Sequence, residues 1–299
     1  MKNGLTLVFF CFFLFQLTIG QTINTENLQK EISKVTDGKK ATIGISVKHI
    51  EKNTSFGLND KMRFPMQSVF KFPQAIYALE LTDKGILELN QEVLVKEEIA
   101  SKFSNSPLKK KYGTSSFIST VEELIRFSVS NSDNLACDVL FELLGGPKAV
   151  DKQLKRWGYK DIQIIFSEIG MSKKINNQFK NYCSPLTMVQ ILSDFQDKKF
   201  LSNKSNELLM KFMIESPTSS KRLKGKLPEN TVVAHKTGTG DGENFIYALN
   251  DVGILTLPDG NHLAIAIFIK NSAEDYDTTE RLIAKITQII FSYFAEESK

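Results

Sequence analysis

Residues 64–71 read FPMQSVFK. Ser68 and Lys71 are three positions apart in this segment, so on a helix their side chains share one face and the ammonium group can reach the hydroxyl group. A serine hydroxyl is a weak nucleophile until a base removes its proton. At a helix N-terminus, backbone N–H groups would also stabilise negative charge that develops near Ser68. The segment therefore indicates a nucleophilic serine at the start of a helix.

The same spacing also fits an ordinary capped amphipathic helix, so the segment alone does not establish an enzyme. Pro73 follows inside the expected helix and cannot donate the backbone hydrogen bond that is expected one turn in. We therefore expect a local distortion near the beginning of this helix.

Two short polar motifs lie further along the chain. The first, SDN at residues 132–134, stands at the junction of two expected helices, and the second, KTG at residues 236–238, stands at the end of an expected strand. Taken alone, the first also fits a helix-capping segment, and the second also fits a strand that runs into a turn. Neither motif by itself indicates a function.

Other common catalytic motifs are absent from the sequence. It contains no H-E-x-x-H, C-x-x-C, Walker or G-x-S-x-G motif, so we expect no metal ion and no cofactor. A Ser-His-Asp triad would need His49, His235 or His262 as its base. Each of these lies in or beside an expected strand, where a histidine is more often an ordinary strand or turn residue.

The hydrophobic pattern predicts strands near both ends of the chain and helices in the middle. Alternating or β-branched runs predict strands at residues 41–47, after a turn at 51–53, and at 231–234, 252–257 and 263–269. Thr120 and Glu123 match a capping box, a second helix covers residues 135–144, and a third ends the chain. We therefore expect a mixed α/β domain built from both termini, an inserted all-helical domain, and a ligand site between the two.

The first twenty residues have the pattern of a cleaved signal peptide. Lys2 precedes an apolar run at residues 5–17, and small residues at positions 18 and 20 suit a signal peptidase. A membrane anchor is the alternative, but the run is shorter than the roughly 20 residues that a span needs. We therefore expect a mature chain that begins at Gln21, a periplasmic or secreted location, and no stable membrane association.

The composition excludes several classes of protein. The chain has 299 residues, 41% of them hydrophobic, and a formal net charge of +4. This is ample length for a large core and too little charge for a nucleic-acid partner. After cleavage Cys137 and Cys183 are the only cysteines, and both a disulfide and two buried free thiols remain open for them.

In their order and separations, the three motifs resemble those of the penicillin-recognising serine enzymes, and they fit the class A β-lactamases well. Glu168 strengthens this resemblance, because it lies seventeen residues before Pro185, as the general-base glutamate does in the class A omega loop. Gln67 and the segment RLKG at residues 222–225 favour the extended-spectrum branch that contains the VEB and PER enzymes. The resemblance covers essentially the whole mature chain.

The resemblance implies a two-domain serine β-lactamase/transpeptidase-like fold, in which an antiparallel sheet is flanked by helices. Its α/β domain would comprise residues 21–66 and 214–299, and its all-helical domain residues 67–213, with the omega loop near 163–185. It also implies a monomer that hydrolyses the β-lactam ring of penicillins and cephalosporins through a serine acyl-enzyme, and so gives antibiotic resistance.

The resemblance further assigns a role to each matching residue. Ser68 would be the nucleophile, Lys71 and Glu168 would share proton abstraction, and Glu168 would activate the deacylating water. The Ser68 and Thr239 N–H groups would form the oxyanion hole. The remaining roles concern the leaving group and substrate binding: Ser132 would relay a proton to the leaving nitrogen, Lys236 would set the field around Ser132, Asn134 would hold the substrate amide, and Thr237, Gly238, Thr239 and Arg222 would line the carboxylate site.

Three positions depart from most class A enzymes. Ser172 replaces the asparagine that helps to hold the deacylating water, and its side chain has a shorter reach. Asp138 and Asn181 stand where most members have Asn and Asp, as in the VEB and PER branch, so we expect a differently fastened omega loop. Two alternative functions stay open: a D,D-peptidase that deacylates β-lactams slowly, and a non-hydrolysing sensor domain that binds them. Glu168 argues against both.

Overall fold

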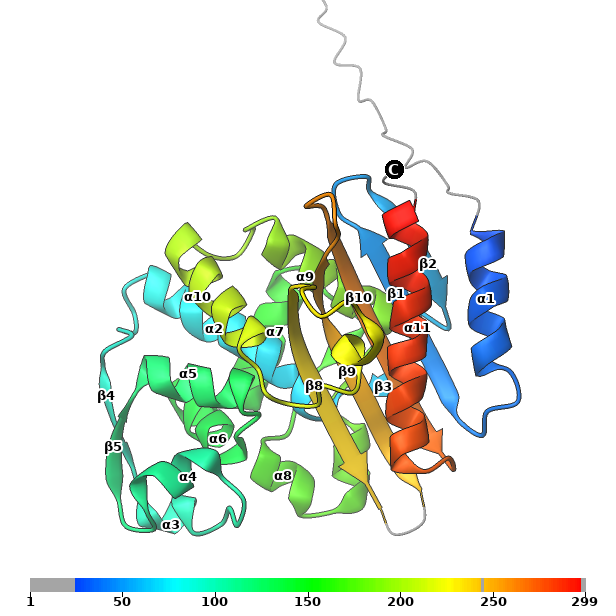
Figure 1. Ribbon diagram of the computed structural model, residues 1–299. Coiled ribbons are helices and arrows are strands. Elements are labelled where there is room, and N and C mark those ends of the chain that lie inside the picture. The colour runs from blue at the N-terminus through cyan, green and yellow to red at the C-terminus, as the bar shows by residue number, and fades with distance from the viewer. Residues whose placement is uncertain (1–24, 243–244, 297–299) are drawn as a thin grey trace, which may run out of the picture.

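A five-stranded antiparallel sheet is the centre of the structure, a computed structural model that describes residues 25–242 and 245–296. The strand order is β2-β1-β10-β9-β8 (Figure 1). The strands are β1 (Thr42–His49), β2 (Thr54–Leu58), β8 (Val233–Asp241), β9 (Ile246–Thr256) and β10 (His262–Ser272). Strands from both ends of the chain thus form one sheet, as the hydrophobic pattern predicts. The expected signal peptide lies outside the described residues.

Alternation along the strands gives this sheet two apolar faces. In β10, Leu263, Ile265 and Ile267 belong to the core on the side of the last helix, whereas Ala266 and Phe268 belong to the core on the opposite side. Successive residues of a strand point to opposite faces, which explains this division. Because both faces are buried, helices must cover both.

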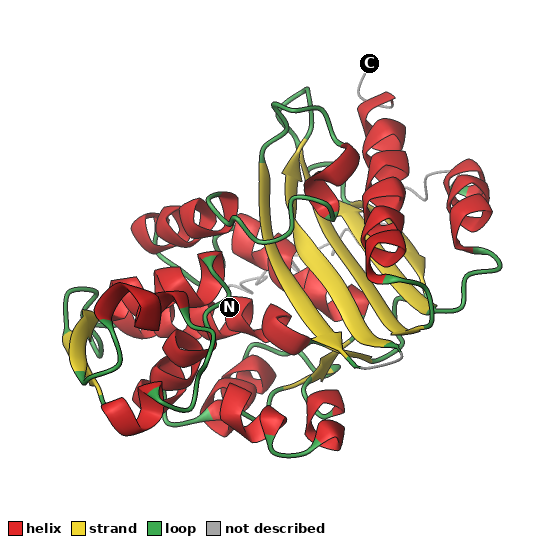
Figure 2. Ribbon diagram, turned by 60° about the horizontal axis from the view of Figure 1, so that its bottom comes forward, coloured by secondary structure: helices red, strands yellow, loops and turns green. Residues whose placement is uncertain are grey.

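Helices do cover both faces of the sheet (Figure 1, Figure 2). On one face α1 (Glu26–Thr36) packs beside α11 (Tyr276–Glu296). The opposite face holds the segment between β2 and β8, whose helices are α2 (Lys71–Asp83), α3 (Glu97–Ala100), α4 (Pro107–Tyr112), α5 (Val121–Ser130), α6 (Asn134–Leu143), α7 (Pro147–Arg156), α8 (Glu168–Ser172), α9 (Pro185–Gln196) and α10 (Asn203–Ile214).

Shorter elements connect these helices. Three are 3-10 turns, namely η1 (Gln67–Phe70), η2 (Ile175–Phe179) and η3 (Leu223–Lys226). Two small sheets also occur, one of β3 (Phe64–Pro65), β7 (Tyr182–Cys183) and β6 (Ile162–Gln163), the other of β4 (Glu92–Val95) and β5 (Phe117–Thr120). No described helix has the length and apolar character that a bilayer span requires.

The predicted capping box is half right. The Thr120 hydroxyl caps α5 by accepting a hydrogen bond from the Glu123 N–H at 3.2 Å. The Glu123 carboxylate does not bond back to the Thr120 N–H, because it accepts from the Ser119 hydroxyl and from Tyr112 Oη, both at 2.7 Å. The Lys111 ammonium group donates to the same carboxylate, so the prediction failed because three side-chain donors lie within its reach.

The expected distortion at Pro73 takes the form of the 3-10 turn η1, which precedes α2 and leaves Pro73 as the third residue of that helix. An N–H group in the first turn has no intrahelical partner, so a proline is tolerated at this position.

The prediction that residues 231–234 form a strand ending at the KTG motif is wrong. Strand β8 runs from Val233 to Asp241, so residues 236–238 lie inside it. The glycines that suggested a turn serve close packing instead: a Cβ on Gly238 would lie 2.3 Å from the Met66 carbonyl oxygen. Because β8 extends to Asp241, which pairs with Ile246, β9 begins at Ile246, earlier than the predicted start at residue 252.

Gly253→Ala tests the closeness of β8 and β9. A Cβ at this position would lie 2.2 Å from the Ala234 carbonyl oxygen and 3.0 Å from the backbone of His235, and backbone cannot turn aside. We expect a loss of about 1–3 kcal/mol in the free energy of unfolding, measured by urea denaturation. Gly170→Ala is the control, since its Cβ would meet only the Phe166 side chain, at 3.2 Å or more. Equal stability of the two variants would contradict this account.

Candidate active site

Ser68 lies in the 3-10 turn η1, which runs directly into α2. Gln67 before it has a φ of 48°, in the left-handed region that non-glycine residues seldom adopt. Such strained backbone persists only where its surroundings fix it, and it is frequent at functional sites. The nucleophile expected from the sequence is therefore held on a constrained turn at the start of a helix.

The Lys71 ammonium group joins four acceptors at the centre of the site, although its side chain is fully buried. Its Nζ lies 2.9 Å from Ser68 Oγ, 2.8 Å from the Ser132 carbonyl oxygen, 2.5 Å from Asn134 Oδ1 and 2.9 Å from Glu168 Oε1. A hydrogen bond of 3.4 Å also joins the Ser68 hydroxyl to Glu168 Oε1. A buried ammonium group is stable only with such partners. The structure thus brings residues from the first two motifs and the omega loop to one point.

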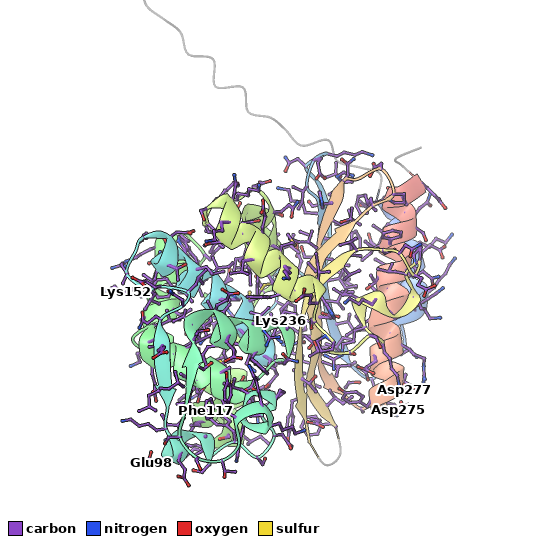
Figure 3. The ribbon with its side chains drawn as sticks, turned by 60° about the vertical axis from the view of Figure 1, so that its left-hand side comes forward. Glu98, Phe117, Lys152, Lys236, Asp275 and Asp277 are labelled. Atoms are coloured by element: carbon purple, nitrogen blue, oxygen red, sulfur yellow. The ribbon has the colours of Figure 1, made fainter. Side chains whose placement is uncertain are left out.

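Lys236 brings the third motif to the same point. Its Nζ donates to the Ser132 hydroxyl at 2.9 Å and to the Thr237 carbonyl oxygen at 3.0 Å. Figure 3 shows Lys236 at the boundary between the helices and the sheet. Burial holds the pKa of the Lys236 ammonium group well below its ordinary value, and the charge of Lys71 lowers it further. Ser132, which lies between the two lysines, has a left-handed φ of 55°.

Asp133 performs the capping that the sequence also allowed for the SDN motif. Its Oδ1 accepts from the Ala136 N–H at 3.0 Å, and its Oδ2 accepts from the Ser106 hydroxyl and the Leu108 N–H, both at 2.7 Å. The motif therefore fastens the start of α6 and presents Ser132 and Asn134 on either side.

Two side chains fasten the omega loop, and Glu168 is the first residue of α8 within it. Asp138 accepts from the Glu168 N–H at 2.7 Å and from the Ile169 N–H at 3.0 Å. Asn181 accepts from the N–H groups of residues 165–166 and donates to the carbonyl of residue 166. Relative to most class A enzymes, Asp and Asn are exchanged at these two positions. Asp138 therefore puts a carboxylate at the N-terminus of α8, where it faces two N–H donors. Asn181 puts an amide where the backbone offers both N–H donors and a carbonyl acceptor.

Ser172 is exposed at the end of α8, and its hydroxyl donates to the Ile169 carbonyl oxygen at 2.9 Å. Its hydrogen is therefore engaged within its own helix, and the oxygen keeps its capacity to accept.

Arg222 is buried behind β8, with an exposed fraction of 1%. Its guanidinium group forms an ion pair with Glu280 at 3.1 Å and donates to Thr239 Oγ1 at 2.7 Å, to Tyr276 Oη at 2.8 Å and to the Gly238 carbonyl at 3.3 Å. The expectation that Arg222 faces the substrate directly does not match this burial. The structure instead places it one contact behind Thr239.

Thr237, the neighbour of Gly238 in β8, donates its hydroxyl to Thr218 Oγ1 at 3.1 Å. Thr218 thus joins the site from the segment before η3, and the sequence motifs give no sign of it.

Cys137 and Cys183 are both free and fully buried. Burial raises the pKa of each thiol well above its ordinary value. Of the two possibilities left open by the sequence, the structure therefore selects buried, unreactive thiols.

Two polar pairs beside the site were not given a role from the sequence. The Gln67 side chain donates to Gln178 Oε1 in the omega loop at 3.2 Å. His235, considered only as a triad base, lies 3.0 Å from both carboxylate oxygens of Asp251. The sequence contained one signal about His235. Because His235 directly precedes Lys236 in a strand, its side chain must point to the face of the sheet opposite to that of Lys236.

Comparison with known proteins identifies the family of the chain. The model of the β-lactamase enzyme family matches residues 27–294. The chain belongs to the β-lactamase enzyme family.

The relatives are class A enzymes of the extended-spectrum branch. The chain is 40% identical to extended-spectrum β-lactamase PER-1 of Pseudomonas aeruginosa, over 89% of this chain and 87% of that protein. It is 37% identical to β-lactamase VEB-1 of the same organism, over 94% and 95%. The crystal structure of TLA-1 extended-spectrum β-lactamase superposes with a TM-score of 0.89 at 38% identity, over 91% of this chain and 100% of that one. The fold and the branch expected from the sequence are thereby confirmed.

The pKa of Asp138 gives a testable dependence of stability on pH. Burial raises this pKa to about 6, against the two N–H groups, and the charge of Glu168 adds to the rise. Between about pH 4 and pH 6 the folded protein therefore holds a proton that the unfolded chain has released, so this group's contribution to stability falls as the pH rises. The fall is on the order of 3 kcal/mol, at about 1.4 kcal/mol for each unit of the rise in pKa.

Asp138→Asn carries no such proton. Urea denaturation of both proteins at pH 4, 5, 6 and 7 should show the wild type losing stability relative to the variant as the pH rises through this range. A difference between the two that stays constant with pH would refute the raised pKa.

Proposed function

We propose that this protein hydrolyses the β-lactam ring of penicillins and cephalosporins through an acyl-enzyme on Ser68, and so confers antibiotic resistance. Family membership supports the activity, and one observation carries the mechanism. The Ser68 hydroxyl lies between Lys71 Nζ at 2.9 Å and Glu168 Oε1 at 3.4 Å. The Glu168 carboxylate can take its proton directly, and Lys71 can take it after passing one of its own protons to Glu168, with which it is paired at 2.9 Å. PER-1 is named an extended-spectrum enzyme, and we propose a similarly broad range of substrates here.

In the acylation step, Ser68 attacks the lactam carbonyl while Lys71 and Glu168 share its proton. The N–H groups of Ser68 and Thr239 stabilise the developing oxyanion. Ser132 passes a proton to the leaving nitrogen, and the Lys236 ammonium group at 2.9 Å polarises its hydroxyl for that transfer. Each of these groups interacts with charge that develops only in the transition state. The groups therefore stabilise the transition state more than the bound substrate, and this lowers the activation barrier.

In the deacylation step, Glu168 removes a proton from the water that attacks the ester. The Asp138 carboxylate accepts hydrogen bonds from the N–H groups of Glu168 and Ile169. These bonds fix the backbone so that the Glu168 carboxylate points toward Ser68. Ser172 helps to position the water by its hydroxyl oxygen. Asn134 holds the amide of the substrate as well as its present partner Lys71.

Thr237 and Thr239 bind the substrate carboxylate along β8, beside Gly238. Arg222 lies behind β8 and donates a hydrogen bond to Thr239 Oγ1, while Glu280 neutralises its charge. Arg222 therefore orients the Thr239 hydroxyl for the substrate instead of meeting the carboxylate itself.

We further propose that the chain is a monomer, exported to the periplasm or secreted after cleavage at residue 20. We take its α/β domain as residues 21–66 and 214–299 and its helical domain as residues 67–213. The two other functions, a slow D,D-peptidase and a silent sensor, are disfavoured by Glu168, since neither needs a base for deacylation.

Glu168→Gln separates the two chemical steps. The variant keeps the shape of the side chain but cannot accept the proton of the attacking water, so deacylation should slow by at least about a hundredfold. Intact-protein mass spectrometry after mixing with a penicillin should show an adduct whose mass gain equals the whole drug.

Two controls complete this experiment. Ser68→Ala should form no adduct, and Glu98→Gln, exposed at the far end of the helical part (Figure 3), should hydrolyse a chromogenic cephalosporin over many turnovers like the wild type. Normal turnover by Glu168→Gln would assign deacylation to another base. A wild-type protein that itself stalls as the adduct would favour the peptidase or the sensor.

A further inference from the structure

A chain of three hydroxyl groups leads from β8 to the end of α5. The Thr237 hydroxyl donates to Thr218 Oγ1 at 3.1 Å, and Thr218 Oγ1 lies 2.8 Å from Ser216 Oγ. The Ser216 hydroxyl, in a buried residue just after α10, donates to the Ser130 carbonyl oxygen at 3.0 Å. One hydroxyl of the KTG motif is thus connected to the backbone of the helical part.

The carbonyl group at the end of this chain fixes the direction of every hydroxyl hydrogen. A carbonyl oxygen can only accept, so the single hydrogen of the Ser216 hydroxyl points toward Ser130. The contact between Ser216 and Thr218 then requires the Thr218 hydroxyl to donate. Thr218 has no second hydroxyl hydrogen, so its contact with Thr237 requires Thr237 to donate. Only this direction satisfies all three contacts, and it commits the Thr237 hydrogen to Thr218.

The Thr239 hydroxyl is in the opposite situation. Thr239 lies two residues further along β8, so its side chain points to the same side of the strand as that of Thr237. Its Oγ1 accepts from the Arg222 guanidinium group at 2.7 Å. Because a guanidinium group can only donate, Thr239 keeps its own hydrogen for another acceptor. Thr239 can therefore donate to an anion without losing this bond, whereas Thr237 cannot do so without losing its bond to Thr218.

We propose that Thr218 competes with the substrate carboxylate for the hydrogen of Thr237, and so determines how tightly the site binds an anionic β-lactam. The inference rests on the proposed function, in which Thr237 and Thr239 bind that carboxylate. When Thr237 turns its hydrogen toward the substrate, the Thr218 oxygen loses its donor, and this cost is subtracted from the affinity. Thr218 is a positioning residue, because it acts on the substrate only through Thr237.

The backbone around Thr218 is held independently of its hydroxyl group. Pro217 precedes it, and a proline restricts φ to a narrow range. Ser219 follows it with a left-handed φ of 43°, and the Ser219 hydroxyl donates to Glu280 Oε1 at 2.5 Å. The Thr218 N–H also donates to Ser216 Oγ at 3.4 Å. Removal of the Thr218 hydroxyl should therefore leave the segment in place and change only the bond to Thr237.

The test is the affinity for a chromogenic cephalosporin, measured by calorimetry in a Ser68→Ala background that cannot form the acyl-enzyme. Thr218→Val keeps the shape of the side chain and cannot accept the Thr237 hydrogen. The hydrogen is then available to the substrate carboxylate, so Kd should fall by about two- to tenfold. Thr218→Ser keeps the hydroxyl group and should bind with the Kd of the background protein.

Two further variants separate this competition from a change in structure. Thr237→Val has no hydrogen to release, so adding Thr218→Val to it should leave Kd unchanged. Thr239→Val removes the donor that is already available, and Kd should rise by about tenfold or more. If Thr218→Val does not fold, Thr218→Ala removes the same hydroxyl group with a smaller side chain.

An unchanged or raised Kd in the folded Thr218→Val variant would overturn the inference. The same is true of an equal fall in Kd when Thr237 is already valine, because the effect would then not pass through the Thr237 hydrogen. A Ser68-containing protein that shows no turnover would instead overturn the proposed function. The two failures are distinguishable, since the Kd values are measured without any chemical step.

Discussion

The buried ammonium group of Lys71 is the interaction on which the rest of the site depends. It lies where no water can reach it, so four oxygens must converge on it from η1, from the junction of α5 and α6, and from the omega loop. Each of those segments is strained or specially fastened. Ser132 has a left-handed backbone, and Asp138 and Asn181 tie down the omega loop. The cost of these arrangements is offset by the stabilisation of one charge, and the same convergence brings the Ser68 hydroxyl against Lys71 and Glu168.

Much of the fold and of the site could be predicted from the sequence, because local patterns and motif order are physical signals. Alternating residues in β1 and β10 predicted strands, and Thr120 predicted the start of α5. The three motifs meet at one point because two lysines contact the second motif: Lys71 reaches the Ser132 carbonyl and Asn134, and Lys236 reaches the Ser132 hydroxyl. Glu168 was singled out by the resemblance to the class A enzymes, through its seventeen-residue separation from Pro185, and in the structure it lies beside Lys71 and Ser68.

The failures at Gly238, Arg222 and His235 share one cause, which is contact between segments far apart in the sequence. Gly238 looked like the start of a turn, yet it allows β8 to lie against the Met66 carbonyl. The burial of Arg222 depends on Glu280 and Tyr276 in α11, more than fifty residues away. The pairing of His235 with Asp251 depends on the register of β8 and β9. Local propensity carries no information about such partners, so tertiary context decided each of them.

The central sheet joins the two ends of the chain, since Thr42 pairs with Lys270 and Lys236 reaches Ser132 from across the sequence. During synthesis the nucleophile emerges long before the strands that complete its surroundings. Pairing of such distant segments forms late and slowly. A shortened chain that lacks β8 to β10 would contain Ser68, Lys71 and Glu168 and still have no Lys236 to act on Ser132. On the proposed mechanism, the site of a nascent chain stays incomplete until β8 docks and brings Lys236 to Ser132.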